Sequence, residues 1–147
     1  VQAWSANLTP DRCTECGVVC ASREELFATS DIVTVHLVLS DRTRGLIGTT
    51  EFQMMKPTAY LVNTSRGPII QESALVSALQ SGSIAGAGLD VYDTEPLPQN
   101  HPLRDLDNAV LTGHTGYVMR ENYVTGYRGV VEDVSAWLNG EPVRLLN

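Results

Sequence analysis

Short apolar runs alternate with helical patterns along most of this chain. The longer runs, such as AYLVN and DIVTVHL, are almost continuously apolar, which is typical of parallel strands covered on both faces. Between these runs, apolar positions recur at the spacing of one helix face. The pattern predicts strands near residues 1–4, 18–20, 32–37, 59–63, 84–91 and 109–112.

Residues that start or stop helices mark the segments between the predicted strands. Thr9 followed by Pro10 is a favourable helix start, and Gly82 is a normal helix stop. Pro57 ends an earlier helical pattern. The predicted helices begin at Thr9 in one case and cover residues 23–28, 49–55, 71–81 and 120–138 in the others.

Strands that alternate with helices predict right-handed βαβ units, and therefore an α/β fold with a doubly wound parallel sheet of the Rossmann-like class. Ligands of such sheets bind beyond the carboxyl ends of the strands. The candidate site residues are therefore those that finish each strand, namely Ser5, residues 36–39, residues 63–67, residues 90–95 and residues 113–116.

Composition and charge exclude several classes of function. The chain has 147 residues, of which 43% are hydrophobic, so it can bury a core of its own. A formal charge of −7 without a basic stripe argues against a nucleic-acid partner. No apolar run approaches the roughly 18 residues of a membrane span, and no secretory signal is visible. We expect a cytoplasmic protein.

Three cysteines lie close together as C-x2-C-x3-C, at Cys13, Cys16 and Cys20. This spacing resembles part of a zinc or iron–sulfur site, but no fourth ligand is near. The simpler interpretation places Cys13 and Cys16 on a short helix that Gly17 ends, with Cys20 in the next strand. We therefore predict no metal site, and an odd number of cysteines favours a reducing compartment.

Several strand ends carry residues suited to catalysis. The planar guanidinium of Arg66 could grip a carboxylate, although a lone arginine in a turn is often only a surface residue. Gly67 allows a ligand or another backbone to approach closely. His114 could exchange protons near neutral pH, and Glu95 could fix its tautomer. Asp90 would need a partner if buried.

Together these residues suit a substrate with a carboxylate, whose carbonyl or hydroxyl group exchanges a proton. Hydride transfer with a nicotinamide is the natural accompanying reaction. The segment GAGLDV is not a phosphate-binding G-x-G-x-x-G loop, because Val91 stands where the third glycine is required. The loop that would hold the cofactor phosphates is therefore not found in these residues.

Several long motifs, in a fixed order along the chain, carry a resemblance to a known family. The segments LVNTSRGPIIQESALVSALQSGSIAGAGLDVYDTEPLP, HPL, NAVLTGHTGY and SDIVTVHLVLSDRTRGLIG resemble the D-isomer-specific 2-hydroxyacid dehydrogenases. The resemblance implies that Arg66 binds the substrate carboxylate, that His114 is the acid/base and that Glu95 is its partner. The cofactor-binding residues that it implies are Ser5, Leu37, Thr64, Ser65, Asp90 and Gly116.

The resemblance also implies a domain organisation. Residues 1–118 would form a partial dinucleotide-binding domain, with Val1 in the family's second strand. The first strand, the glycine loop, its helix and the substrate domain are expected upstream, so the sheet should show a gap beside its first two strands. Residues 119–147 would form a helix and tail that in relatives return toward the substrate domain. We expect these 147 residues alone to be inactive.

The chain departs from the family pattern at a few positions. Val38 and Gly113 stand where relatives often carry proline, and Ser5 stands where relatives carry the acidic residue that holds the adenosine ribose. The implied cofactor is NAD, and the uncharged Ser5 leaves NADP as an alternative. The implied substrate is a small 2-ketoacid or 2-hydroxyacid, and the implied complete protein is a homodimer. Two other interpretations stay open: a nicotinamide-sensing binding module with little turnover, and a truncated product that does not fold.

Overall fold

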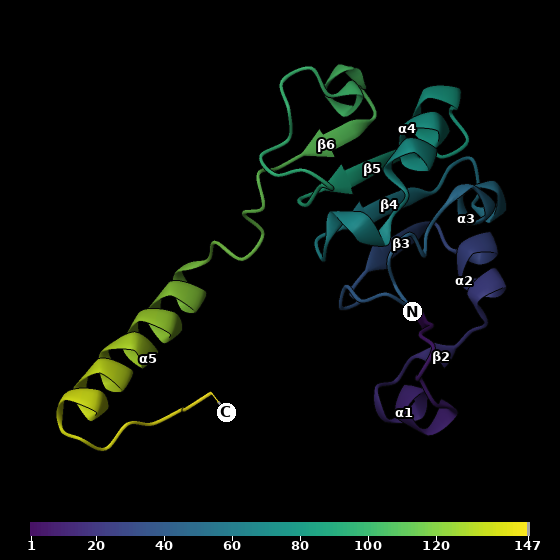
Figure 1. Ribbon diagram of the computed structural model, residues 1–147. Coiled ribbons are helices and arrows are strands. Elements are labelled where there is room, and N and C mark those ends of the chain that lie inside the picture. Colours follow the sequence, from purple (N-terminus) through teal and green to yellow (C-terminus); the bar gives the residue numbers. More distant parts are fainter. Residues whose placement is uncertain (147) are drawn as a thin grey trace. The chain divides into compact units, whose positions relative to one another are not determined.

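The computed structural model describes residues 1–146 and divides the chain into two compact units, Val1–His114 and Thr115–Asn147. The first unit holds all the strands and the second holds one long helix (Figure 1). The predicted domain boundary, after residue 118, and the return of the last helix toward a substrate domain stay predictions.

The first unit alternates parallel strands with helices, as the apolar pattern predicts. Helix starts follow local chemistry: Ser22 and Glu25 form a reciprocal capping box at one helix, and Gly82 ends another in the left-handed conformation. The elements are β1 Gln2–Ala3, α1 Pro10–Glu15, β2 Val19–Cys20, α2 Arg23–Thr29, β3 Ile32–Val35, α3 Thr49–Met54, β4 Tyr60–Asn63, the 3₁₀ turn η1 Gly67–Ile69, α4 Glu72–Ser81, β5 Gly86–Leu89, η2 Pro102–Asp105 and β6 Ala109–Leu111.

The strands form two sheets within the described residues. One is the pair β1–β2, and the other has the order β3-β4-β5-β6, with every neighbouring pair parallel. A cavity of about 950 Å³ is lined both by residues of β1 and by residues of β3. The gap between the sheets therefore lies where the sequence predicts that a central strand is lacking, and the α/β fold class is confirmed.

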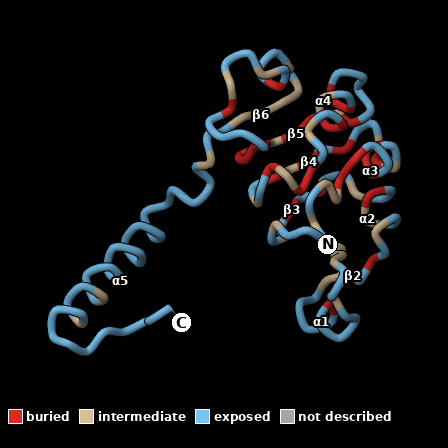
Figure 2. The backbone as a smooth tube through the Cα atoms, in the orientation of Figure 1, coloured by how far each residue is buried: buried red, intermediate tan, exposed pale blue. Residues whose placement is uncertain are grey.

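One face of the four-stranded sheet is covered by helices. Helices α2, α3 and α4 lie side by side against it, and the buried residues of sheet and helices form one core (Figure 2). The fully buried Leu61 of β4 lies in this core, with Phe27 from α2, Phe52 from α3 and Leu75 from α4. This packing fixes the strands whose carboxyl ends carry the candidate site.

The other face of the same sheet corrects one expectation from the sequence. Burial alternates along β3 and β4, and Ile32, Tyr60 and Val110 are exposed. The apolar runs predicted strands covered on both faces, but in this structure the second face is open. Apolar residues on such a face are typical of a surface that packs against another element.

The cysteines lie around helix α1 as expected. Cys13 is buried inside α1, Cys16 caps its end and Cys20 lies in β2, and none of the three is in a disulfide. Within residues 1–146, no cluster of three or more His, Cys, Asp or Glu side chains could hold a metal ion. The lack of a metal site stays a prediction.

The second unit consists mainly of α5, Arg120–Leu138, whose bounds match the sequence prediction. None of its residues is buried (Figure 2). Apolar residues recur along it at helical spacing, including Tyr123, Tyr127, Val134 and Trp137. The tail folds back on the helix, because Arg144 binds Asp133. No helix in the described part of the chain is both long and apolar enough to cross a membrane.

Candidate active site

The arginine of the site is carried by a turn that a buried asparagine organises. Asn63, the last residue of β4, is 1% exposed. Its Oδ1 accepts a hydrogen bond from the Ser65 amide at 3.0 Å, and its Nδ2 donates to the Arg66 carbonyl at 3.0 Å. The side chain therefore replaces strand hydrogen bonds across residues 63–66 and sets the path of the chain after the strand.

This turn is also tied to its neighbours on both sides. The Ser65 hydroxyl donates to the Val35 carbonyl at 2.7 Å, which joins the turn to the end of β3. On the other side, a Cβ atom at Gly67 would lie 2.1 Å from the carbonyl carbon of Tyr92. The sequence left open whether Gly67 admits a ligand or a backbone, and the structure places the backbone of residue 92 there.

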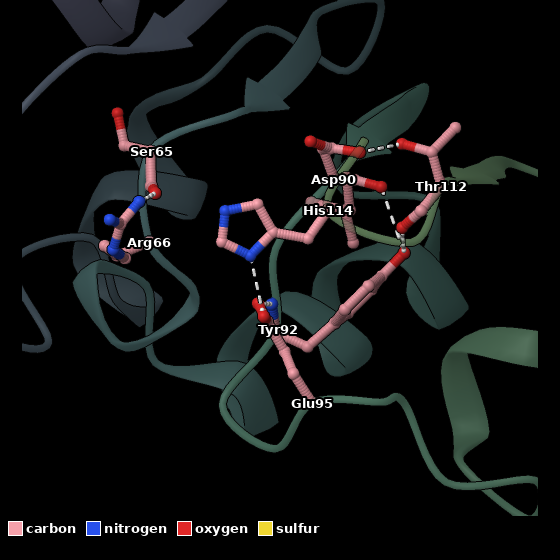
Figure 3. A network of polar contacts seen from close by, with 8 residues as sticks. Ser65, Arg66, Asp90, Tyr92, Glu95, Thr112 and His114 are labelled. Atoms are coloured by element: carbon pink, nitrogen blue, oxygen red, sulfur yellow. Dashed lines mark hydrogen bonds and ion pairs between the residues drawn. The ribbon is translucent and has the colours of Figure 1, made fainter. Parts of the chain in front are cut away.

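Arg66 itself is exposed at this strand end. Its Nη1 donates to the Ser65 carbonyl at 2.6 Å, which orients the guanidinium. The pKa of the Glu95 carboxyl group is lowered mainly by its hydrogen bond with His114, and the charge of Arg66 adds a smaller contribution in the same direction. Figure 3 shows Arg66, His114 and Glu95 gathered in one region beyond the sheet.

His114 and Glu95 form an imidazole–carboxylate pair. The two residues follow different strands, β6 and β5, yet His114 Nδ1 donates to Glu95 Oε2 at 2.7 Å (Figure 3). The other carboxylate oxygen accepts from the Tyr92 amide at 2.9 Å. The hydrogen bond from His114, then that from Tyr92, lowers the pKa of Glu95 from its ordinary value. Glu95 is therefore ionised and holds Nδ1 protonated.

The backbone at His114 is unusual for a residue with a side chain. Its φ of 57° lies in the left-handed region, which a non-glycine residue adopts only at a cost in energy. This conformation turns the chain sharply after Gly113 at the end of β6. The ring is 35% exposed, so it reaches Glu95 while staying accessible to a small molecule.

A third set of contacts joins the ends of β5 and β6. Asp90 is buried at the end of β5 and accepts a short hydrogen bond from the Thr112 hydroxyl. The Tyr92 hydroxyl lies 3.0 Å from the Leu89 carbonyl and 2.8 Å from the Thr112 carbonyl, so one donor serves both strand ends. Burial raises the pKa of Tyr92, which keeps it a neutral donor.

Sequence reasoning singled out Arg66, Glu95, His114 and Asp90, and the structure brings these residues to one edge of the sheet. It included Tyr92 in the candidate range 90–95 without giving it a role, and it did not include Thr112; these two residues join the strand ends. An aromatic residue directly after a strand gives no sign of where its hydroxyl lies. Asn63 did carry a signal, since a polar amide at the end of an apolar strand needs partners when buried.

The remaining predicted cofactor residues do not all lie in one part of the structure. Ser5 and Leu37 both line the cavity of about 950 Å³ beside β1 and β3. Ser65 binds the end of β3, and Thr64 is exposed in the same turn. Gly116 belongs to the second unit. Contacts of these residues with a cofactor stay predictions.

The comparisons with known proteins agree with the motifs. A profile of the "D-isomer specific 2-hydroxyacid dehydrogenase, NAD binding domain" family matches residues 1–116. The chain belongs to this family. The prediction of an NAD-binding domain from the D-2-hydroxyacid dehydrogenases is therefore confirmed.

Individual members of the family show how far the likeness extends. The chain is 45% identical to a glyoxylate reductase of Aeropyrum pernix over 134 residues, which cover 90% of the chain and 40% of that enzyme. The chain therefore spans well under half the length of this relative. The fold matches the D-isomer specific 2-hydroxyacid dehydrogenase of Xanthobacter autotrophicus Py2 with a TM-score of 0.82 and 35% identity, covering 98% of the chain and 47% of that structure.

A second solved structure bears on the cofactor. The NAD-complexed D-isomer specific 2-hydroxyacid dehydrogenase of Lactobacillus delbrueckii ssp. bulgaricus matches with a TM-score of 0.84 and 26% identity, covering all of this chain and 48% of that one. The residues at this edge of the sheet are compatible with NAD as the cofactor. Ser5 and Leu37 line an open cavity, and the strand ends offer the polar groups of Ser65 and Asp90 at the same edge.

Proposed function

We propose that the full-length protein is an NAD-dependent D-2-hydroxyacid dehydrogenase and that this chain carries its catalytic residues. The observation that supports it most is the 2.7 Å pair of His114 and Glu95, with Arg66 close by at a neighbouring strand end. This set combines an anion-binding group with a proton donor whose tautomer is fixed. A 2-ketoacid needs both groups side by side.

Arg66 binds the substrate carboxylate, with two parallel hydrogen bonds from its planar guanidinium. This grip places the C2 carbonyl next to the imidazole of His114. During reduction the Nε2 proton of His114 moves to the carbonyl oxygen, while Glu95 holds Nδ1. The negative charge that develops on that oxygen is thereby neutralised. In the oxidation direction the neutral imidazole takes the proton from the hydroxyl group.

The cofactor supplies one part of this chemistry: when bound, NADH donates the hydride that C2 receives. Thr64, Ser65 and Asp90, which follow neighbouring strands, would line the nicotinamide side of the site. Ser5 and Leu37 would line the adenosine side. The Thr112 hydroxyl holds Asp90 at its strand end, so this carboxyl group cannot swing freely into the site.

The substrate is proposed only as a class. The Aeropyrum pernix relative is named a glyoxylate reductase, and a relative in Archaeoglobus fulgidus is named a D-3-phosphoglycerate dehydrogenase. Both names are consistent with a small 2-ketoacid or 2-hydroxyacid. A homodimeric complete protein is likewise a prediction.

The proposal is tested by steady-state NADH oxidation with glyoxylate and with hydroxypyruvate, using the full-length protein. We expect turnover with at least one of these small 2-ketoacids. NADH binding, followed by fluorescence, without turnover of any 2-ketoacid would instead favour the nicotinamide-sensing module. No binding of NADH would contradict both interpretations.

Arg66→Lys keeps the positive charge but loses the two-point grip on the carboxylate. Because a charge-assisted hydrogen bond contributes about 1.5–3 kcal/mol, we expect KM for the 2-ketoacid to rise tenfold or more. We also expect kcat to fall, because the carbonyl is no longer held in line with His114. Arg12→Lys is the matched control, since Arg12 pairs with Glu15 on α1 and should leave KM unchanged. An unchanged KM in Arg66→Lys would remove the role given to Arg66.

Glu95→Gln should change the pH dependence of reduction. The hydrogen bond from His114 lowers the pKa of Glu95, so the Glu95 carboxylate is ionised throughout the neutral range and places a negative charge beside the proton donor. The substitution removes that negative charge, so we expect the basic limb of the kcat profile to move down in pH. The profile from pH 5 to 10 measures this shift. Glu24→Gln, on the exposed side of α2, is the control. A profile with the same basic limb would show that Glu95 is only a loop residue.

A further inference from the structure

A second imidazole–carboxylate pair lies at the far end of the loop that carries Glu95. This loop, residues 91–101, leaves β5 and ends at His101, the N-cap of η2. There His101 Nε2 lies 2.9 Å from Oε1 of Glu72, the first residue of α4. Neither residue has a part in the proton transfer proposed above.

Both ring nitrogens of His101 are occupied within the protein. Nδ1 accepts a hydrogen bond from the Leu103 amide at 3.2 Å, so the proton must be on Nε2, which donates to Glu72. The His101 side chain is only 12% exposed. A histidine that is mostly covered and hydrogen-bonded through both ring nitrogens is suited to holding two elements together.

The loop has one further tie near the same end. Arg104 donates from Nε to the Pro98 carbonyl at 2.8 Å and from Nη2 to the Leu97 carbonyl at 2.7 Å. Leu97 and Leu103 are buried in the main core. Those contacts keep the loop compact, and within residues 1–146 the His101–Glu72 hydrogen bond joins its end to α4, a helix that packs on the sheet.

Other charged groups lie near the His101–Glu72 pair. Asp93, on the loop, has a pKa raised mainly by burial and further by the charge of Glu72, while Arg44 and His101 act in the opposite direction. Around the catalytic pair, the Glu95 carboxylate faces His114, the Tyr92 amide and Arg66.

We propose that His101 and Glu72 act as positioning residues, which anchor the loop to α4 so that the Glu95 carboxylate stays in hydrogen-bond contact with His114. The inference rests on the proposed function, because that function makes the contact between Glu95 and His114 important for catalysis. Its physical basis is that a 2.7 Å hydrogen bond from a loop residue survives only if the loop cannot shift by a fraction of an ångström.

Substitutions at two positions separate anchoring from mere folding. His101→Asn keeps an oxygen that can accept from the Leu103 amide, as asparagine does at many caps, but it is too short to reach Glu72. Glu72→Gln keeps a hydrogen-bond acceptor for Nε2 and is the conservative variant, whereas Glu72→Ala removes it. Glu15→Ala, which breaks an exposed ion pair on α1, is the matched control.

The test uses the full-length protein and two measurements. We expect His101→Asn and Glu72→Ala to lower kcat about tenfold with little change in KM, and Glu72→Gln to recover most of the loss. The pKa of Glu95, followed by carboxyl ¹³C NMR in the protein without substrate, should rise toward its ordinary value in the first two variants. In a Glu95→Gln background, His101→Asn should lower kcat no further.

An unchanged Glu95 pKa in His101→Asn and Glu72→Ala would overturn the inference. An equally large loss of kcat when His101→Asn is added to the Glu95→Gln background would also overturn the inference, because His101 would then affect the rate by a route other than Glu95. If His101→Asn does not fold, the same two readouts from Glu72→Ala decide. An unshifted basic limb of the kcat profile in Glu95→Gln would instead contradict the role that the proposed function gives to Glu95, and the NMR result would still report on the anchor.

Discussion

His114→Asn should lower kcat for 2-ketoacid reduction by a factor of about 10² to 10⁴, the usual range for loss of a general acid. The amide of asparagine has no proton that it can release at neutral pH. It leaves the developing charge on the substrate oxygen without a proton donor, while Arg66 still binds the carboxylate. We therefore expect KM for the 2-ketoacid to change much less than kcat.

Asparagine is the right replacement because of the backbone at this position. His114 adopts a φ of 57°, and asparagine is among the few residues that tolerate the left-handed region. The turn after β6 should keep its shape, so the loss of rate reports on chemistry rather than on folding. Alanine would add backbone strain and confuse the two effects.

NADH affinity, measured by fluorescence titration, is the internal control for this variant. It should stay within about twofold of the wild-type value, because the imidazole acts on the substrate oxygen and not on the cofactor's phosphates. A kcat close to wild type in His114→Asn would show that another group delivers the proton. The 2.7 Å pair with Glu95 would then be structural.

The order of elements could be predicted from the sequence because it depends on local patterns. The apolar run at residues 59–63 gave the strand that the structure has as Tyr60–Asn63, and Gly82 marked the end of α4. Since the strands of the four-stranded sheet are parallel, their carboxyl ends meet at one edge. That alone placed Arg66, Glu95 and His114 in the same region before any contact was known.

The contacts within that region could not be predicted, because they depend on tertiary geometry. Glu95 and His114 are 19 residues apart, and no pattern shows that one carboxylate oxygen meets the ring while the other meets the Tyr92 amide. The open face of the sheet was also missed. Continuous apolar runs predict that both faces of a strand are covered but do not say which segment covers them, and Ile32 and Tyr60 are exposed within residues 1–146.

The residue that couples the two halves of the site is a glycine. Gly67 directly follows Arg66, and Tyr92 donates the amide that holds Glu95, so their contact sets the distance from the anion-binding group to the acid/base pair. A Cβ at position 67 would lie 2.1 Å from one backbone atom of Tyr92 and 2.3 Å from another. Backbone atoms in a packed core cannot shift to relieve a steric clash as the end of a flexible side chain can.

Gly67→Ala should therefore push the arginine turn and the Glu95 loop apart. We expect it to cost about 3 kcal/mol or more of unfolding free energy, at the upper end for overpacking, because the clash is with backbone. In the protein that still folds, kcat/KM should fall by about 10² or more, since an error of 1 Å between reacting groups has that effect. Urea denaturation and steady-state kinetics measure the two losses.

Gly126→Ala is the matched control, because that glycine lies inside α5 and a Cβ there would meet nothing within 4 Å. It should raise helix stability by up to about 1 kcal/mol and leave kcat/KM unchanged. If Gly67→Ala were as stable and as active as Gly126→Ala, the backbones of residues 67 and 92 could not be in the close contact described. The spacing between Arg66 and the His114–Glu95 pair would then have to be set by other contacts of the arginine turn, such as the Asn63 and Ser65 hydrogen bonds.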